Sequence, residues 1–265
     1  MKIPDLFSLK GKIALITGGE RMYGKSCSVA LTEAGAKLYM ACPFLDAAEE
    51  TANELRTAGS EVEVVQYFQD DAASIRRLVE HVVEKENRID VFINACRVIP
   101  KGKTGWFQEG DGLDWSVKVN SAGMLYVTTL VGKQMIAQRS GSIISFASMM
   151  GLVGIEKHNY DGEPAMAESA FSHDYALNKS GIIAWTRHAA SYYGRFGVRV
   201  NTVCPGGVQS DRTPAQFMEN YAKHTQLNRL ANNDDIKGPI VFLASDASAY
   251  LTGLSIPVDG GYTCI

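Results

Sequence analysis

Short apolar runs alternate with longer segments of helical periodicity along almost the whole chain. The runs are nearly continuous in Val, Ile, Leu and Ala, which is typical of strands buried on both faces. The longer segments repeat apolar residues at helical spacing, and two of them end at a glycine. We expect strands at 12–17, 36–41, 62–67, 90–94, 142–146, 198–203 and 255–258. We expect helices at 24–34, 47–58, 72–86, 114–138 and 234–244, and one that carries residue 175 and ends near 193.

This alternation predicts an α/β fold: a doubly wound, seven-stranded parallel sheet of the Rossmann-like type, with helices on both faces. The 265 residues form a single domain in this interpretation, residues 1–265, which is long enough to bury a large core. Ligands of such sheets bind outside the carboxyl ends of the strands, so polar residues at those ends are the candidates for a site.

Charge and cysteine content exclude several classes of function. The net charge of −3 and the charged fraction of 21% give no indication of a nucleic-acid or anionic-membrane surface. No signal peptide or membrane span is expected, because the first apolar run is far too short. The five cysteines are odd in number and form no Cys-x-x-Cys pair, so we expect reduced, mostly buried thiols in a cytoplasmic protein without bound metal: Cys27, Cys42, Cys96, Cys204 and Cys264.

One tyrosine–lysine pair carries the strongest chemical signal. Tyr175 and Lys179 are spaced i, i+4, which places them on one face of a helix. A phenol has a pKa of about 10, and a lysine ammonium nearby favours the phenolate. The pair therefore suits a general acid/base for an alcohol or a ketone.

In the order and spacing of its motifs, the chain resembles the short-chain dehydrogenase/reductase family from Leu9 to Tyr262. The resemblance implies that Tyr175 exchanges a proton with the substrate oxygen and that Lys179 binds the nicotinamide ribose. It also implies that Ser148 holds the substrate oxygen, and that Asn120 holds a water linking Lys179 to solvent. The matching segments are 17–18 with Gly24, 118–123, Ser148, 175–179, 199–201, 205–206, 242–246 and 258–261.

The predicted cofactor cradle departs from the family pattern at its glycine turn. Met22 stands at the position of the second glycine, where its side chain would crowd the phosphates. Arg21 precedes it, and an arginine matches a 2′-phosphate well, so we expect NADP(H) over NAD(H). No acid follows the second strand at Cys42 to bind the adenosine ribose.

The adenine side of the cradle is also altered. Phe68 would stack on adenine where an aspartate is usual, or a small gap in the alignment would bring Asp70 there instead. Arg97 replaces a glycine and is expected near the cofactor or the substrate mouth. The expected cofactor residues are Gly18, Arg21, Met22, Tyr23, Gly24, Cys42, Phe68, Gln69, Asn94, Ala95, Tyr175, Lys179, Pro205, Gly206 and Val208.

An insertion at 149–174 separates Ser148 from Tyr175 more widely than in most members of the family. A similar extension occurs in some sugar-acid and polyol dehydrogenases of the family. We expect specificity to come from this insertion, from 101–111 with Trp106 and Phe107, and from the loop after Pro205. The residues singled out in the insertion and in that loop are His158, Tyr160, His173, Arg212, Phe217 and Tyr221, and we expect the two histidines at the surface.

These features favour an NADP(H)-preferring oxidoreductase that interconverts a secondary alcohol and a ketone on a small polar substrate. One alternative is a non-redox enzyme, such as a halohydrin dehalogenase or a lyase, that uses Ser148 and Tyr175 without a dinucleotide. The altered glycine turn favours this alternative, and Lys179 argues against it. A non-catalytic binding protein on the same scaffold is a third possibility. The family resemblance further implies a homo-oligomer, a dimer or a homotetramer.

Overall fold

The computed structural model describes residues 2–98, 106 and 110–265. At its centre lies a seven-stranded sheet in the order β3-β2-β1-β4-β5-β6-β7, with every neighbouring pair parallel. The order reverses beside β1, which confirms the doubly wound fold. The strands are β1 Ile13–Thr17, β2 Lys37–Cys42, β3 Val62–Gln66, β4 Val91–Asn94, β5 Gly141–Phe146, β6 Val198–Pro205 and β7 Ser255–Val258.

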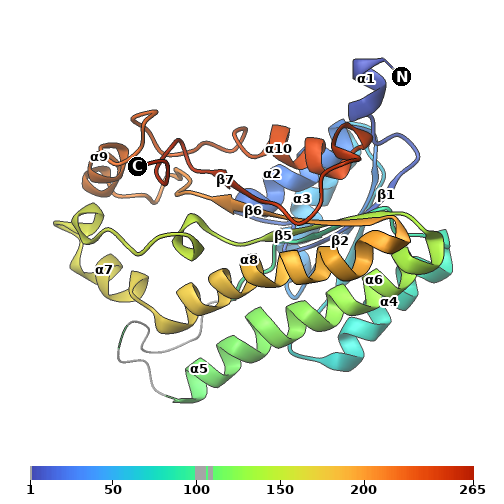
Figure 1. The fold of residues 1–265 in the computed structure, drawn as a ribbon, viewed down its shortest axis with the longest axis horizontal. Coiled ribbons are helices and arrows are strands. Elements are labelled where there is room, and N and C mark those ends of the chain that lie inside the picture. The colour runs from blue at the N-terminus through green and yellow to red at the C-terminus, as the bar shows by residue number, and fades with distance from the viewer. Residues whose placement is uncertain (1, 99–105, 107–109) are drawn as a thin grey trace.

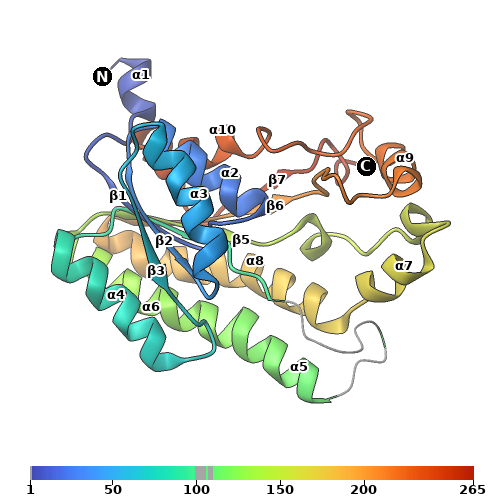
Figure 2. The same cartoon turned by 180° about the vertical axis from the view of Figure 1, so that it is seen from behind.

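Helices cover both faces of the sheet, as predicted. Figures 1 and 2 show α2, α3 and α10 on one side and α4, α6 and α8 on the other. Among the described residues, no helix has the length and apolarity needed to cross a bilayer. The helix bounds are α1 Ile3–Phe7, α2 Met22–Glu33, α3 Leu45–Thr57, α4 Ala72–Glu86, α5 Gly110–Val117, α6 Met124–Gln138, α7 Pro164–Ala170, α8 His173–Tyr193, α9 Ala215–Ala222 and α10 Lys237–Ala244.

The helix predicted at 114–138 is interrupted, which corrects the sequence interpretation. It begins at Gly110 and contains a π-helical turn, η1, at Lys118–Gly123. Gly123 approaches the chain after β3 so closely that a Cβ there would lie 1.9 Å from the carbonyl oxygen of Gln69. Single π-helical turns of this kind are frequent at functional sites, and this one carries Asn120. Helices α7 and α9 were not predicted either.

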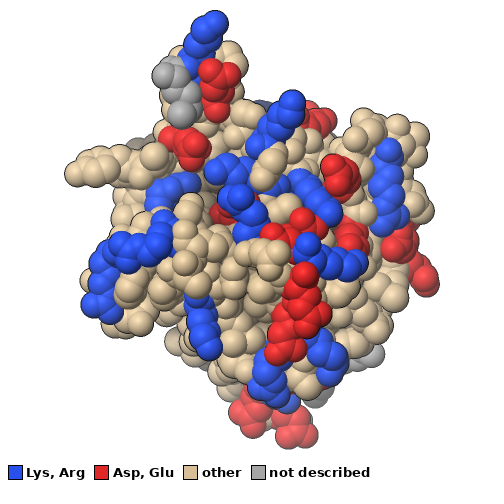
Figure 3. Space-filling view, turned by 90° about the vertical axis from the view of Figure 1, so that its right-hand side faces the viewer, with Lys and Arg blue, Asp and Glu red and all other residues tan. Residues whose placement is uncertain are grey.

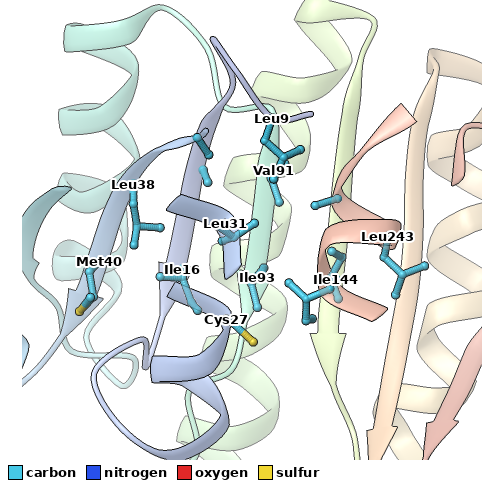
Figure 4. Close-up of a cluster of buried hydrophobic side chains, with 14 of the residues drawn as sticks. Leu9, Ile16, Cys27, Leu31, Leu38, Met40, Val91, Ile93, Ile144 and Leu243 are labelled. Atoms are coloured by element: carbon cyan, nitrogen blue, oxygen red, sulfur yellow. The ribbon is translucent and has the colours of Figure 1, made fainter. Parts of the chain in front are cut away.

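Two hydrophobic cores lie on the two faces of the sheet. Figure 4 shows the core under α2 and α10, in which Ile16, Leu31 and Ile144 are fully buried. The second core lies under α4, α6 and α8. Both faces of the strands are covered, which explains why the sequence runs are continuously apolar instead of alternating.

The cysteines differ in part from expectation. All five cysteines are free thiols, but Cys264 is exposed and Cys96 is only half buried, so neither is the buried residue that we expected. Figure 3 shows lysine, arginine, aspartate and glutamate side chains interspersed over one face of the molecule.

Candidate active site

The tyrosine–lysine pair lies on α8, where the helix passes the carboxyl end of β5. Lys179 is buried, and its Nζ donates a hydrogen bond to the carbonyl oxygen of Phe146 at 2.7 Å. The same Nζ lies 6.0 Å from the centre of the Tyr175 ring. Tyr175 is half buried, and among the described residues its hydroxyl has no hydrogen-bond partner. The phenol oxygen is therefore available to a ligand.

Lys179 titrates close to neutral pH. Burial lowers the pKa of its ammonium from 10.5 to about 7, and the positive charge of Arg97 acts in the same direction. Desolvation disfavours the charged form, because water no longer stabilises it. Among buried groups, such a shift is typical of residues that exchange protons in a site.

Ser148 follows β5 and is oriented by its own turn. Its Oγ accepts a hydrogen bond from the backbone N–H of Met150 at 3.1 Å. Its hydroxyl hydrogen has no acceptor among the residues that the structure describes. Ser148 is therefore held in place and is still able to donate to a substrate oxygen.

Asn120 is held by the chain beyond β4. Its side-chain Oδ1 accepts from the N–H of Val98 and its Nδ2 donates to the Val98 carbonyl oxygen, both at 2.9 Å. The Nδ2 also donates to Oγ of Ser116 at 3.0 Å. The amide thus fixes the segment after β4 against the π-helical turn, a role that the sequence did not indicate.

A small cavity lies between Asn120, Tyr175 and Lys179, and Ser148 is not among the residues that line it. Its volume is about 30 Å³, which exceeds the space that one water requires. Asn94 and Ser145, which are paired in register on β4 and β5, both line it, and each has a buried polar atom, Nδ2 and Oγ respectively, without a hydrogen-bond partner among the described residues. The cavity lining includes Asn94, Cys96, Arg97, Asn120, Ser145, Asp174, Tyr175 and Lys179.

The glycine turn leads into the N-terminus of α2. The N-terminus of α2 has no side-chain cap, so its free N–H groups are open to an anion. Gly24 packs so closely that a Cβ there would lie 1.8 Å from the Gly18 carbonyl oxygen. Met22 adopts a φ of +49°, the left-handed conformation usual for glycine, and its side chain is 56% exposed. Met22 therefore occupies the turn in a conformation that glycine adopts without strain.

Tyr23 connects two predicted parts of the cofactor cradle. Its hydroxyl donates to the carbonyl oxygen of Gly206, just after β6, at 3.2 Å. Gly206 in turn donates its N–H to Val258 on β7 at 3.0 Å. Val208 lies further along the same loop, where it forms a backbone bridge with Ala231. The glycine turn and the loop after β6 therefore face each other across the carboxyl edge of the sheet.

The adenine side of the predicted cradle holds the two residues, Phe68 and Asp70, between which the sequence left the choice open. The ring of Phe68 is 42% exposed and so is available for stacking. The carboxylate of Asp70 instead accepts a hydrogen bond from the indole N–H of Trp115 at 3.2 Å. Gln69 is buried, and its amide donates to the Val119 carbonyl oxygen at 2.8 Å. The side chain of Gln69 thus holds the π-helical turn against the chain after β3.

An acid that the sequence analysis missed stands near the end of β2. The carboxylate of Glu20, from the glycine turn, raises the pKa of the thiols of both Cys42 and Cys96 in addition to the effect of burial. Its Oε2 is buried and unpaired among the described residues. Because Glu20 comes from the β1 turn and not from β2, its proximity could not be inferred from a motif at Cys42.

The insertion forms a structured lobe over the loop after β6. Figure 1 shows α7 and α9 at the same end of the molecule. Asn159 is fully buried and bonds both to the Tyr262 hydroxyl at 2.9 Å and to Nδ1 of His224 at 2.7 Å. The ring of Tyr160 packs on Phe217 at 5.2 Å. Two of the segments that we expected to set specificity therefore fold together beside Ser148.

The remaining predicted specificity residues are only partly described. Of the segment 101–111, residues 101–105 and 107–109, which include Lys101 and Phe107, lie outside the described residues. Trp106 packs against the ring of His173 at 4.1 Å. The ring of His158 contacts the carboxylate of Asp161 at 3.1 Å.

Known proteins match this chain over almost its whole length. A family model described as enoyl-(acyl carrier protein) reductase matches residues 20–263. The chain is 33% identical to an NADP-dependent mannitol dehydrogenase of Hypocrea jecorina, covering 99% of this chain and 96% of that protein. It is 30% identical to a 2-dehydro-3-deoxy-D-gluconate 5-dehydrogenase of Pseudoalteromonas atlantica, covering 97% and 98%.

Solved structures agree with this assignment. A gluconate 5-dehydrogenase from Burkholderia cenocepacia, in complex with NADP and tartrate, superposes over 100% of both chains with a TM-score of 0.88 and 25% identity. The chain is therefore a member of the short-chain dehydrogenase/reductase family of oxidoreductases.

Proposed function

We propose that this protein is an NAD(P)-dependent oxidoreductase that interconverts a secondary alcohol and a ketone on a small polar substrate. The supporting observation is the free phenol of Tyr175 beside a buried lysine that titrates near neutral pH, at the carboxyl edge of the sheet. Ser148 follows β5, the strand whose last residue binds Lys179, and its hydroxyl hydrogen has no acceptor among the described residues. Together these groups can hold a carbonyl oxygen and move one proton to or from it.

Each residue has a distinct part in the proposed reaction. A nicotinamide dinucleotide would supply or accept the hydride at the substrate carbon. Ser148 donates a hydrogen bond to the substrate oxygen and fixes its position. Tyr175 gives its proton to that oxygen during reduction and takes it back during oxidation. The positive charge of Lys179 stabilises the phenolate that remains after the transfer.

We propose NADP(H) as the preferred cofactor. Arg21 is exposed at the N-cap of α2, where a guanidinium suits a 2′-phosphate. The mannitol dehydrogenase named above is NADP-dependent, and the Burkholderia dehydrogenase was solved with NADP. Glu20 lies close to the end of β2 and favours NAD(H) instead, because a carboxylate repels a phosphate and suits the two hydroxyls of an unmodified ribose.

Titration of the purified protein with NADPH and with NADH, followed by nicotinamide fluorescence, tests the cofactor. Saturable binding is expected, with NADPH bound more tightly. Binding of neither dinucleotide would refute the redox proposal and would favour non-redox chemistry at Ser148 and Tyr175.

A substrate screen with Tyr175→Phe as the control tests the chemistry. Small ketones, polyols and sugar acids are followed at the nicotinamide absorbance band. General acid/base catalysis typically contributes a factor of about 10² to 10⁴, so a loss of that size is expected without a change in dinucleotide affinity. An active Tyr175→Phe variant would refute the assignment.

We also propose a cytoplasmic homo-oligomer, a dimer or a tetramer, assembled through the long helices α6 and α8. Light scattering after size exclusion measures its mass, and a monomer would contradict this.

A further inference from the structure

Arg97 lies directly against the proposed proton donor. It follows β4, and its guanidinium carbon is 4.4 Å from the centre of the Tyr175 ring. Its side chain is exposed and also lines the cavity that Asn120, Tyr175 and Lys179 share. At this distance the guanidinium is within cation–π range of the ring, and its N–H groups have no hydrogen-bond partner among the described residues, so they are available to a ligand.

The positive charge of Arg97 is not balanced by the groups around it. Among the described residues, no carboxylate forms an ion pair with it. Of the described residues that line the cavity, the one acid is Asp174, and it accepts hydrogen bonds from the hydroxyls of Ser116 and Ser172. Lys179 is the second cation of the site, and it donates to the Phe146 carbonyl oxygen. Among the described residues, Arg97 is thus the cation at the opening beside Tyr175 whose charge no side chain neutralises.

We propose that Arg97 binds a carboxylate of the substrate, so that the enzyme acts on hydroxy acids and the corresponding oxo acids. The carboxylate lies within a few bonds of the reacting carbon, because the guanidinium packs on the ring whose hydroxyl meets the substrate oxygen. The planar fork of an arginine matches the two oxygens of a carboxylate. A single unpaired guanidinium balances one negative charge, which suits a carboxylate better than a phosphate dianion. This inference rests on the proposed function, because it names the substrate class of the same site.

The test compares acids with their neutral amides in four proteins. Small hydroxy acids, from lactate to gluconate, and the matching amides are titrated calorimetrically into the wild type, Arg97→Met, Arg97→Lys and Arg195→Met. Arg195 is the matched control, because its exposed guanidinium also lies over an aromatic ring, 4.8 Å from that of Tyr192, at the far end of α8. NADPH and NADH affinities are measured in parallel.

In the wild type, at least one acid is expected to bind about 10- to 100-fold more tightly than its amide, the range for hydrogen bonds to a charged group. Arg97→Met should abolish this preference and leave dinucleotide affinity unchanged. Arg97→Lys should keep part of it, and Arg195→Met all of it. The inference is overturned if no acid surpasses its amide, if the preference survives in Arg97→Met, or if that variant loses dinucleotide affinity to the same degree.

The same experiments distinguish a failure of the carboxylate site from a failure of the proposed function. If acids bind through Arg97 but none is oxidised with either dinucleotide, the redox proposal falls and the carboxylate site stands. If neutral alcohols are oxidised and acids gain nothing from Arg97, the carboxylate site falls and the redox proposal stands.

Discussion

Replacement of Lys179 by methionine should change how the stability of the fold depends on pH. The folded state lowers the pKa of Lys179 from 10.5 to about 7, because the side chain is buried and Arg97 is near. Between these two values the unfolded chain binds one more proton than the folded chain, so stability rises with pH. The buried lysine therefore costs the fold nothing above pH 10.5, and the cost grows as the pH falls toward 7.

The magnitude follows from the size of the shift. The full difference corresponds to about 5 kcal/mol, and the part that falls between pH 6 and pH 9 is roughly 2–3 kcal/mol. The wild type should therefore gain about that much unfolding free energy over this range relative to Lys179→Met, in which the group is neutral at every pH.

Urea unfolding at a series of pH values, followed by tryptophan fluorescence, measures this difference. Lys10→Met is the control, because Lys10 is an exposed lysine in the loop before β1. Parallel curves for the wild type and Lys179→Met would refute the reasoning, since they would mean that Lys179 titrates alike in the folded and unfolded states. Arg97→Met should shift the rise in stability to higher pH, because it removes a neighbouring positive charge.

Three further predictions concern the cofactor cradle. Gly24→Ala should destabilise the fold by more than about 1 kcal/mol and weaken NADPH binding, because its Cβ would lie 1.8 Å from the Gly18 carbonyl oxygen. Gly181→Ala on α8 is the control: its Cβ would meet no atom within 4 Å, so it should change neither stability nor binding. Met22→Gly should raise the melting temperature, or leave it unchanged, because φ of +49° costs a non-glycine residue about 1 kcal/mol. The same variant should strengthen dinucleotide binding, and weaker binding would show that the thioether contacts the cofactor. Glu20→Gln should increase NADPH affinity relative to NADH in fluorescence titrations, since it removes a charge near the end of β2; an unchanged ratio would place the 2′-phosphate elsewhere.

The fold followed from the sequence because its signals are local. Continuous apolar runs mark strands buried on both faces, and helical spacing marks the crossovers between them, so the sheet and its layers could be predicted. The interruption of the helix at 114–138 could not, because the turn packs against Gln69, far away in the chain, and periodicity carries no signal for such a contact.

The candidate site also combines residues that the sequence predicted with contacts that only the structure shows. Tyr175 and Lys179 were predicted as neighbours because four residues make about one helical turn, and the spacing alone fixes which face they share. The family pattern added Ser148 and Asn120, but their partners, Met150 and Val98, are visible only in the structure.

Three features depended on tertiary structure alone. The carboxylate of Glu20 lies near the end of β2, the guanidinium of Arg97 packs on Tyr175, and Asn159 joins the insertion to Tyr262. Each connects elements that the sheet brings together at its carboxyl edge. The sequence determined which elements form, because periodicity is a property of neighbouring residues. Only packing decided which side chains meet, because contacts between distant segments depend on the order of the strands.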